Sequence, residues 1–256
     1  MATPGHATVG QDGWLGLWNA RDLGGTPAGD GQAVREGALV RSEAPVRLGE
    51  LGWGQVVDHG VRTVVDLRTT QEAAEKPSTL GGVDVDVVNV SLEEGLEDDE
   101  LFSSWASSRL IGTPLYYEPF LQRWPGRCAQ ALQAVADARP GGVLVHCAKG
   151  RDRTGLVVAL VLLVCEVGVE EIVADYADSG RRLAGPVARA AGAPDESEET
   201  RRVLATQGFT EAAAAMRHFL LTADPRDRLR AAGLRPSDEA ALRARMLGGP
   251  PGSPLM

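Results

Sequence analysis

The amino-acid sequence predicts an α/β protein with a central, mainly parallel sheet flanked by helices. Two observations support this fold class. Segments with the apolar density of strands alternate along the chain with helical segments, a pattern typical of layered α/β proteins. Hydrophobic residues make up 43% and charged residues 24% of the 256 residues, which is close to the average of soluble globular proteins. A chain of this length can bury a core without disulfides or metals.

The first part of the chain carries most of the strand signals. Residues 32–42 predict two short strands, and residues 62–68, dense in β-branched side chains, predict a buried strand. Residues 70–75 then predict a short helix that ends before Pro77. Apolar and polar side chains alternate over residues 83–92, which predicts another strand.

Helical signals follow. Residues 93–112, acidic at the front and rich in serine later, predict a mobile, lid-like helical segment. Residues 119–138 predict one amphipathic helix, and residues 143–145 predict a short buried strand. The almost wholly apolar residues 154–167 predict a helix buried against the sheet, and residues 170–179 predict a further helix.

These elements are expected to form a single domain over residues 17–247. Residues 1–16, rich in glycine, are expected to be a flexible N-terminus, and residues 248–256 a disordered tail. Within the domain, a linker rich in Ala, Gly, Pro and Glu is expected at residues 185–199, and short C-terminal helices over residues 198–247.

Composition and charge exclude several classes of function. The net charge of −9 argues against general binding to nucleic acid or to an anionic membrane surface. No apolar segment approaches the roughly 18 residues of a transmembrane span, and the N-terminus lacks the basic start and apolar core of a signal peptide, so a cytoplasmic location is expected. The spacing of Cys128, Cys147 and Cys165 indicates neither a disulfide framework nor a zinc site.

One segment carries the candidate chemistry. Between the strand predicted at 143–145 and the apolar helix stand, in order, His146, Cys147, Ala148, Lys149, Gly150, Arg151, Asp152, Arg153, Thr154 and Gly155. A cysteine nucleophile must be a thiolate, a form that a helix N-terminus and nearby cations favour. Backbone N–H groups at such a turn also attract an anion, so the natural ligand is a phosphate. Arg153 can bind two phosphate oxygens at once, and Thr154 can donate a hydrogen bond to the sulfur.

The spacing between Cys147 and Arg153 is weak evidence by itself, because about one such sequence in four contains it by chance. The preceding strand, the glycines and the following apolar helix strengthen it. The alternative is a buried cysteine in a strand-to-helix turn whose arginines point to solvent. Cations clustered beside a cysteine are costly unless they meet an anion, which favours a phosphate-binding loop.

With its flanking motifs, the loop resembles that of the protein-tyrosine-phosphatase superfamily, whose signature is His-Cys-x5-Arg-Ser/Thr. The chain looks closest to the bacterial tyrosine and lipid phosphatases that share an Asn-Phe-Arg-Asp-Leu-Gly-Gly segment. The matching residues are Asn19-Ala20-Arg21-Asp22-Leu23-Gly24-Gly25, Arg41-Ser42, Asp66-Leu67-Arg68 and Glu72. The resemblance covers about residues 17–180, and residues 231–243 are similar to the C-terminal helices of that group.

The resemblance implies a protein-tyrosine-phosphatase-like fold and hydrolysis of phosphate monoesters through a phospho-cysteine at Cys147, with no metal and no other cofactor. In the subfamily the aspartate before the loop arginine is assigned as general acid, which corresponds to Asp152 here. Because a general acid must come within hydrogen-bond reach of the leaving oxygen, Asp98 or Asp99 on the lid-like segment is the alternative.

The loop also departs from the subfamily pattern. Lys149 stands two positions after the cysteine, Arg151 replaces the family lysine, and Ala20 replaces an aromatic residue. In related enzymes, added cations in this loop accompany activity on phosphoinositides. We therefore expect a protein tyrosine phosphatase and leave dual specificity and phosphoinositide hydrolysis open. The expected partner is a phosphorylated protein, a phosphoinositide or a small phosphate ester.

Further residues in and around the loop are expected to bind substrate. The predicted substrate-binding set is Ala148, Lys149, Gly150, Arg151, Thr154, Gly155, Arg21, Asp22, Asp66 and Arg68, with His146 orienting the loop. For Arg21 and Asp22 the alternative is a structured turn. For Asp66 and Arg68, at a strand end where α/β sheets bind ligands, it is a capping salt bridge. Tyr116 and Tyr117 are expected to pack, and the acidic residues 93–100 to form a solvated face.

Two other functions remain as alternatives. A catalytically silent protein could keep the loop as a phosphate-binding scaffold, although Cys147, Asp152 and Arg153 are all intact. A rhodanese-like sulfur transferase also carries a cysteine ahead of a helix, but the Arg-Asp-Leu-Gly-Gly segment favours the phosphatase.

Overall fold

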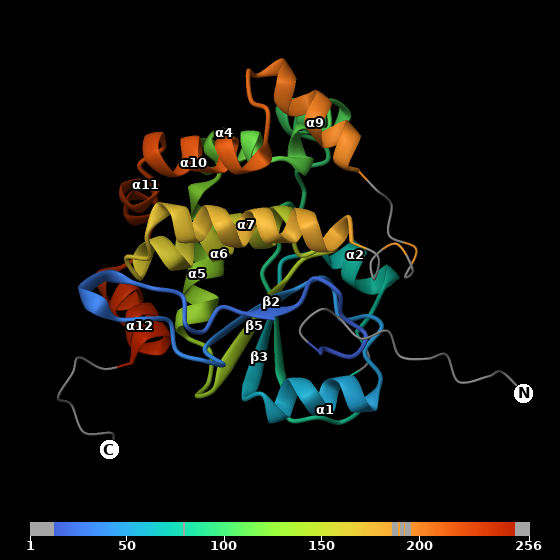
Figure 1. Ribbon diagram of the computed structural model, residues 1–256, viewed down its shortest axis with the longest axis vertical. Helices are drawn as coiled ribbons and strands as arrows, with labels where there is room; N and C mark the ends of the chain where they lie inside the picture. Colours follow the sequence, from blue (N-terminus) through green and yellow to red (C-terminus); the bar gives the residue numbers. More distant parts are fainter. Residues whose placement is uncertain (1–12, 79, 186–188, 190–191, 193–195, 249–256) are drawn as a thin grey trace, which may run out of the picture.

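The computed structural model describes residues 13–78, 80–185, 189, 192 and 196–248. At its centre is a five-stranded sheet in the order β1-β2-β5-β3-β4 (Figure 1). β2 (Leu39–Ser42) and β3 (Val61–Asp66) pair with the two sides of β5 (Gly142–His146), and β4 (Asp86–Asn89) pairs with β3, all in parallel. β1 (Arg21–Asp22) is antiparallel to β2. The prediction of a mainly parallel sheet is confirmed.

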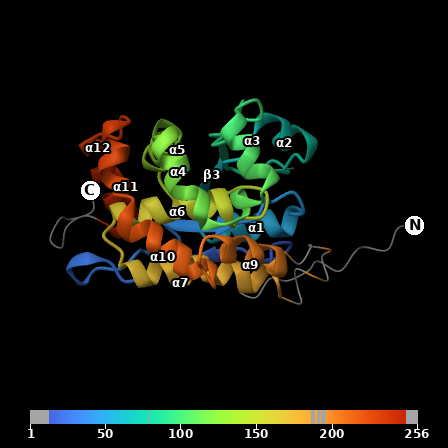
Figure 2. The same cartoon turned by 90° about the horizontal axis from the view of Figure 1, so that it is seen from above.

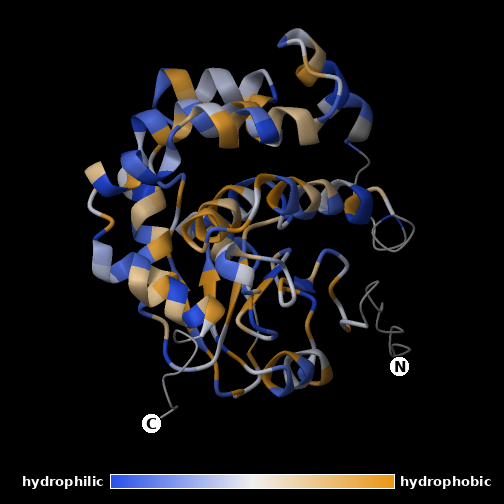
Figure 3. Cartoon of the chain, turned by 60° about the vertical axis from the view of Figure 1, so that its left-hand side comes forward, coloured by the Kyte–Doolittle hydropathy of each residue, from blue (hydrophilic) through white to orange (hydrophobic). Residues whose placement is uncertain are grey.

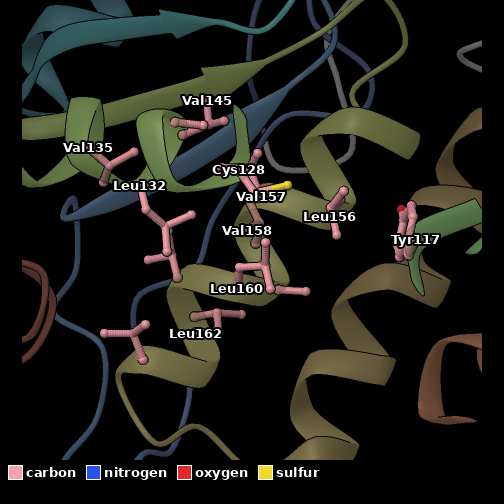
Figure 4. Close-up of a cluster of buried hydrophobic side chains, with 14 of the residues drawn as sticks. Tyr117, Cys128, Leu132, Val135, Val145, Leu156, Val157, Val158, Leu160 and Leu162 are labelled. Carbon is pink, nitrogen blue, oxygen red and sulfur yellow. The ribbon is translucent and has the colours of Figure 1, made fainter. Parts of the chain in front are cut away.

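Alternation along the strands divides the interior into two cores. Val143 and Val145 of β5 belong to the larger core, which includes α5 (Pro125–Ala136) and α6 (Asp152–Val164). Leu144 belongs to the smaller core, which includes Trp53 of α1 (Glu50–Asp58). Figure 4 shows Val145 with side chains of α5 and α6 in the larger core. Helices therefore cover both faces of the sheet.

α6 is the most deeply buried helix of the site. Its residues from Thr154 to Leu162 are all buried, because the helix packs against β5, α5 and α7 (Val169–Leu183). An apolar surface all round a helix is what burial on every side requires. Figure 3 shows this apolar ribbon in the interior, whereas the outer helices alternate between hydrophilic and hydrophobic residues.

The C-terminal helices complete the helical layers. α9 (Ser197–Thr206) packs against α10 (Ala212–Thr222), which crosses α7. α11 (Pro225–Ala231) and α12 (Pro236–Leu247) pack against α5 and α6. Figure 2 shows α10 and α7 on the opposite side of the molecule from α2 and α3. Proline opens both α11 and α12, a position where its missing N–H costs no helical hydrogen bond.

Two predicted elements were wrong. The single helix expected at 119–138 is divided into α4 (Tyr117–Arg123) and α5. Pro125 causes the break, because it cannot donate to the preceding turn and instead begins α5. Residues 32–42 form only one strand, β2, which follows the expected turn at Gly37, whose φ is +71°. Ala33 makes only an isolated bridge with Pro27.

Other expected elements appear with adjusted limits. α2 (Thr70–Glu75) has the predicted bounds and begins with a capping box between Thr69 and Glu72. The segment 93–112 contains α3 (Glu100–Ser107) and a 3-10 turn, Leu110–Gly112. The predicted N-terminus and tail, and much of the predicted linker, lie outside the described residues. In the described ranges, no helix is long and apolar enough to cross a membrane.

Candidate active site

The candidate site lies where β5 ends and α6 begins. Cys147 follows directly on the central strand, and Asp152 is the first residue of α6. Cys147 is 3% exposed and lines a cavity of about 280 Å³ together with Asp152, Arg153 and Glu93. The carboxyl edge of a parallel sheet is where open α/β folds bind their ligands. The sequence-predicted loop is therefore brought to the expected edge.

Gly150 allows the loop to pack against β2. Its φ is +69°, a left-handed conformation that favours glycine. A Cβ atom added here would lie 2.2 Å from the carbonyl oxygen of Ser42 and 2.5 Å from the amide nitrogen of Glu43. No side chain can be accommodated against this backbone, so the glycine is required for the close approach.

Buried donors hold the loop carbonyls in place. Asn19, which is fully buried, donates from Nδ2 to the carbonyl oxygens of Lys149 at 2.9 Å and Gly150 at 3.1 Å. Arg41 Nη2 donates to the same Gly150 oxygen at 2.7 Å. The sequence did not indicate these roles for Asn19 and Arg41, because both lie more than a hundred positions from the loop.

Arg21 supports the loop from a distance. It donates to Asn19 Oδ1 at 2.8 Å and to Asp175 Oδ1 at 2.8 Å, and Asp175 also pairs with Arg41. Burial and the neighbouring Arg41 charge lower the pKa of Arg21 to about 10, against the attraction of Asp175. Arg21 lines neither the cavity at Cys147 nor the larger one described below, and its contacts brace Asn19; direct binding of substrate by Arg21 stays a prediction.

Asp22 does not contact the loop. Its carboxylate accepts hydrogen bonds from the backbone of Gly24 at 2.9 Å and Gly37 at 2.7 Å, and pairs with His59 Nε2 at 2.8 Å. These contacts fit the structured-turn alternative, and Asp22 lines neither the cavity at Cys147 nor the larger one described below, so its role in substrate binding stays a prediction. The side chains of Arg21 and Asp22 make contacts on opposite faces of the sheet, because adjacent residues of a strand point to opposite faces.

Asp66 and Arg68 form a buried salt bridge beside the loop. Arg68 Nη2 lies 2.7 Å from Asp66 Oδ2, and both residues are less than 5% exposed. His146 Nδ1 lies 3.7 Å from Asp66 Oδ1 and 3.2 Å from the Cys147 carbonyl oxygen. Burial lowers the pKa of His146 to about 4 although Asp66 opposes the shift. The contacts of Asp66 are thus with Arg68 and His146. Arg68 also lines the larger cavity described below.

Arg153 is held by two carboxylates. Its Nη1 lies 2.5 Å from Glu72 Oε2 and 3.2 Å from Glu93 Oε2, and its Nη2 donates to Glu72 Oε1 at 2.8 Å. Burial opposes ionisation of Glu72, but the hydrogen bonds and charge of Arg153 lower its pKa to about 2. Glu93 is only 13% exposed, so the prediction that residues 93–100 form a solvated face was wrong at this position.

Asp152 is the carboxyl nearest to Cys147 in sequence and lines the same cavity. Its Oδ1 pairs with Arg151 Nε at 2.9 Å. The alternative acid Asp99 caps α3, where it accepts from the amides of Leu101 and Phe102 and pairs with Arg123 at 3.1 Å. Neither Asp99 nor the other alternative, Asp98, lines either cavity, so the placement favours Asp152 as the donor.

The start of α6 is packed closely against aromatic residues. A Cβ atom on Gly155 would lie 2.8 Å from the Tyr117 hydroxyl, and that hydroxyl donates to the Asp152 carbonyl at 2.7 Å. Tyr117 therefore packs, as expected, and also anchors the helix. Thr154 Oγ1 is buried and makes no hydrogen bond to any described residue, so the predicted bond to the Cys147 sulfur is not formed.

A larger cavity of about 860 Å³ adjoins the first. The two share Ala148, Lys149, Arg151, Glu196 and Thr200. Lys149 pairs with Glu196, and Arg151 Nη2 lies 3.5 Å from the same carboxylate. Two of the predicted substrate-binding cations therefore lie between the cavities and share one acidic partner. Within the described residues, no three His, Cys, Asp or Glu side chains form a group that could hold a metal ion.

The fold and the candidate site place the chain in a class of α/β proteins. Proteins of this class carry a cysteine in a loop between a parallel strand and a buried helix, where an anion can bind. The chain belongs to the tyrosine phosphatase family, whose sequence model matches residues 13–248. This membership bears out the resemblance to tyrosine phosphatases.

Individual relatives agree with this family. The chain is similar to a tyrosine-protein phosphatase of Nostoc commune, with 32% identity over 163 residues, 62% of this chain and 54% of the relative. It is also similar to the triple specificity protein phosphatase PtpB of Mycobacterium tuberculosis, with 32% identity over 186 residues, 63% of this chain and 66% of the relative. A protein of Cupriavidus necator is 31% identical over 172 residues, 65% of this chain and 62% of its own length. The matched part thus spans between about half and two thirds of these relatives.

Proposed function

We propose that this protein hydrolyses phosphate monoesters through a phospho-cysteine intermediate. The observation that carries the proposal is that Cys147, Asp152 and Arg153 line one cavity at the start of a buried helix. Loop amides and the helix N-terminus attract the phosphate dianion, and Arg153 stabilises the charge that develops on its oxygens.

The reaction proceeds in two steps. The Cys147 thiolate attacks phosphorus, the S–P bond forms, and the P–O bond to the leaving group breaks while Asp152 gives its proton to the leaving oxygen. Water then attacks the thiophosphate, its proton passes to Asp152, and the thiolate leaves with release of inorganic phosphate. The cycle returns every group to its starting form without a cofactor.

The substrate class follows from the space and charge around the loop. The larger cavity, with Arg68, Lys149 and Arg151 in its lining, accommodates more than a single phosphate group. We propose protein tyrosine phosphatase activity with dual specificity, in keeping with the tyrosine and triple specificity phosphatases among the relatives. Phosphoinositide hydrolysis is the second candidate, since several cations suit a head group with several phosphates.

Replacing the nucleophile tests the proposal. Cys147→Ser is expected to abolish phosphate release from p-nitrophenyl phosphate and from phosphotyrosine peptides, while circular dichroism shows an unchanged fold. Cys128→Ala is the matched control, because Cys128 is fully buried in the core, where burial raises its pKa to about 12. Unchanged hydrolysis by Cys147→Ser would refute the mechanism. A wild-type protein that binds phosphate but releases none would support the scaffold alternative, and sulfur transfer from thiosulfate would support the rhodanese-like one.

A further inference from the structure

Glu93 presents an unpaired oxygen in the candidate active site. It lies between β4 and α3, and its Oε2 is 3.2 Å from Arg153 Nη1. Its other oxygen, Oε1, is buried and makes no hydrogen bond to any described residue. Glu93 lines the same cavity as Cys147. One oxygen of Glu93 thus pairs with Arg153, and the other has no hydrogen-bond partner among the described residues.

A buried oxygen without a hydrogen bond destabilises the fold unless a ligand supplies the missing hydrogen bond. A buried polar group without a hydrogen bond costs about 1–3 kcal/mol, and most buried polar atoms in native structures are paired. Tyr116 and Thr154, whose hydroxyl oxygens are also buried and unpaired, belong to the same part of the molecule. Of these three residues only Glu93 lines the cavity that holds Cys147, which indicates that a bound ligand supplies the missing partner of its Oε1.

The expected ligand is negatively charged, which restricts the protonation state of the Glu93 carboxyl group when the ligand is bound. Two anionic oxygens at hydrogen-bond distance repel each other, whereas a proton between them makes a short, charge-assisted bond. We propose that Glu93 is a substrate-binding residue whose carboxyl group, carrying a proton, donates a hydrogen bond from Oε1 to an oxygen of the bound phosphoryl group. The inference rests on the proposed phosphatase function and adds a binding residue that the loop motif does not contain.

The surroundings of Glu93 favour the protonated form. The charged groups that face it are Arg153 and Asp152 of α6, Glu72 of α2 and Arg127 of α5, with the Tyr116 hydroxyl and the Cys147 sulfur nearby. Burial raises the pKa of Glu93, Glu72 and Asp152 raise it further, and Arg153 opposes the shift.

Glu72, the other partner of Arg153, behaves in the opposite way. It receives hydrogen bonds from both Nη atoms of Arg153, and its pKa is lowered to about 2 against the effect of burial. Arg153 is therefore held by one ionised carboxylate and one carboxyl group that can keep a proton.

Sulfate binding provides the test, because sulfate is a dianion that carries no proton at neutral pH. Calorimetric affinity for sulfate would be measured on the full chain at increasing pH. In the wild type, we expect affinity to fall by about tenfold per pH unit above the pKa of Glu93, as one proton is lost. Glu93→Gln keeps an N–H donor that does not titrate, so this decline should disappear while binding persists. Glu93→Ala should weaken binding about 10- to 100-fold at the pH of tightest binding.

Glu72→Gln is the matched control, since it alters a carboxylate with the same arginine partner. It should keep the fall in sulfate affinity with rising pH, displaced to lower pH because the Glu72 charge that raises the pKa of Glu93 is lost. The inference is overturned if Glu93→Gln retains the wild-type decline, or if Glu72→Gln removes it equally. Circular dichroism checks the fold, and Glu93→Gln carries the test should Glu93→Ala not fold. Because sulfate binding needs no turnover, a protein that releases no phosphate but shows the Glu93-dependent decline would refute the proposed reaction and support this inference.

Discussion

Removing the side chain of Asn19 should loosen the catalytic loop. Asn19→Ala deletes the hydrogen bonds to the carbonyl oxygens of Lys149 and Gly150, and the one received from Arg21. The Gly150 oxygen keeps its bond from Arg41, but the Lys149 oxygen loses its hydrogen bond from Asn19. Two neutral bonds contribute about 1 kcal/mol each, and the bond from a charged donor about 1.5–3 kcal/mol. Since such terms are not additive, we expect a loss of about 3 kcal/mol in the free energy of unfolding.

For a chain of this size, that loss lowers the melting temperature by about 6–12 °C. A shifted loop also misplaces Cys147, and an error of about 1 Å in position costs about a hundredfold in rate. The assays are thermal unfolding and kcat/KM for p-nitrophenyl phosphate. Asn89→Ala is the control, because Asn89 Nδ2 bonds two carbonyls in the same way, those of Asp66 and Arg68. An Asn19→Ala protein with wild-type kcat/KM, or an equal loss of kcat/KM in Asn89→Ala, would refute the role assigned to Asn19.

Two further predictions concern the loop and its supports. Gly150→Ala forces a Cβ atom to within 2.2 Å of the Ser42 carbonyl oxygen, so it should lower the free energy of unfolding in urea by more than about 3 kcal/mol and abolish activity. Gly25→Ala is the control, because Gly25 is also at positive φ but has nothing within 4 Å of an added Cβ, and it should lower the free energy of unfolding by only about 1 kcal/mol. Similar effects of the two substitutions would contradict the close approach at Gly150. Burial raises the pKa of Glu43 to about 7, although hydrogen bonds from Trp18 and Asn19 oppose the shift, so Glu43 stabilises the fold more as pH falls from about 7. His146 acts in the opposite direction: its pKa is lowered to about 4 from 6.5, so it destabilises the fold as pH falls below about 6.5. The two effects offset each other in the wild type, and Glu43→Gln should reveal a fall of about 1.4 kcal/mol per pH unit between about pH 6.5 and 4.5; a stability that stays flat in this variant would show that His146 does not titrate as inferred.

Local chemistry made the loop predictable from sequence. A β-branched strand, a glycine-containing turn and an apolar helix occur in consecutive residues, so their order in space follows from their order in the chain. Cys147, Asp152 and Arg153 accordingly line one cavity. The break at Pro125 could also have been anticipated, because proline is disfavoured inside a helix and favoured at its start.

Contacts between distant segments were beyond the reach of sequence patterns. Glu93 stands in an acidic run that looks like a solvated surface, yet its neighbour Leu92 is buried and turns the segment toward Arg153. Asp22 and Arg21 are adjacent and belong to one motif, but alternation on β1 sends only Arg21 toward the loop. Asp175 lies on a helix face whose partners, Arg21 and Arg41, are set by tertiary packing alone.

The central place of β5 in the sheet has a consequence for how long the site stays intact. Both edges of this strand are hydrogen-bonded to parallel neighbours, and the loop continues directly from its end. Segments at a surface open frequently at little cost, whereas a strand between two others is released only when most of the domain opens. The strand from which the loop continues therefore has the lifetime of the whole fold. A substitution deep in either core that speeds global unfolding would shorten that lifetime without touching a single catalytic atom.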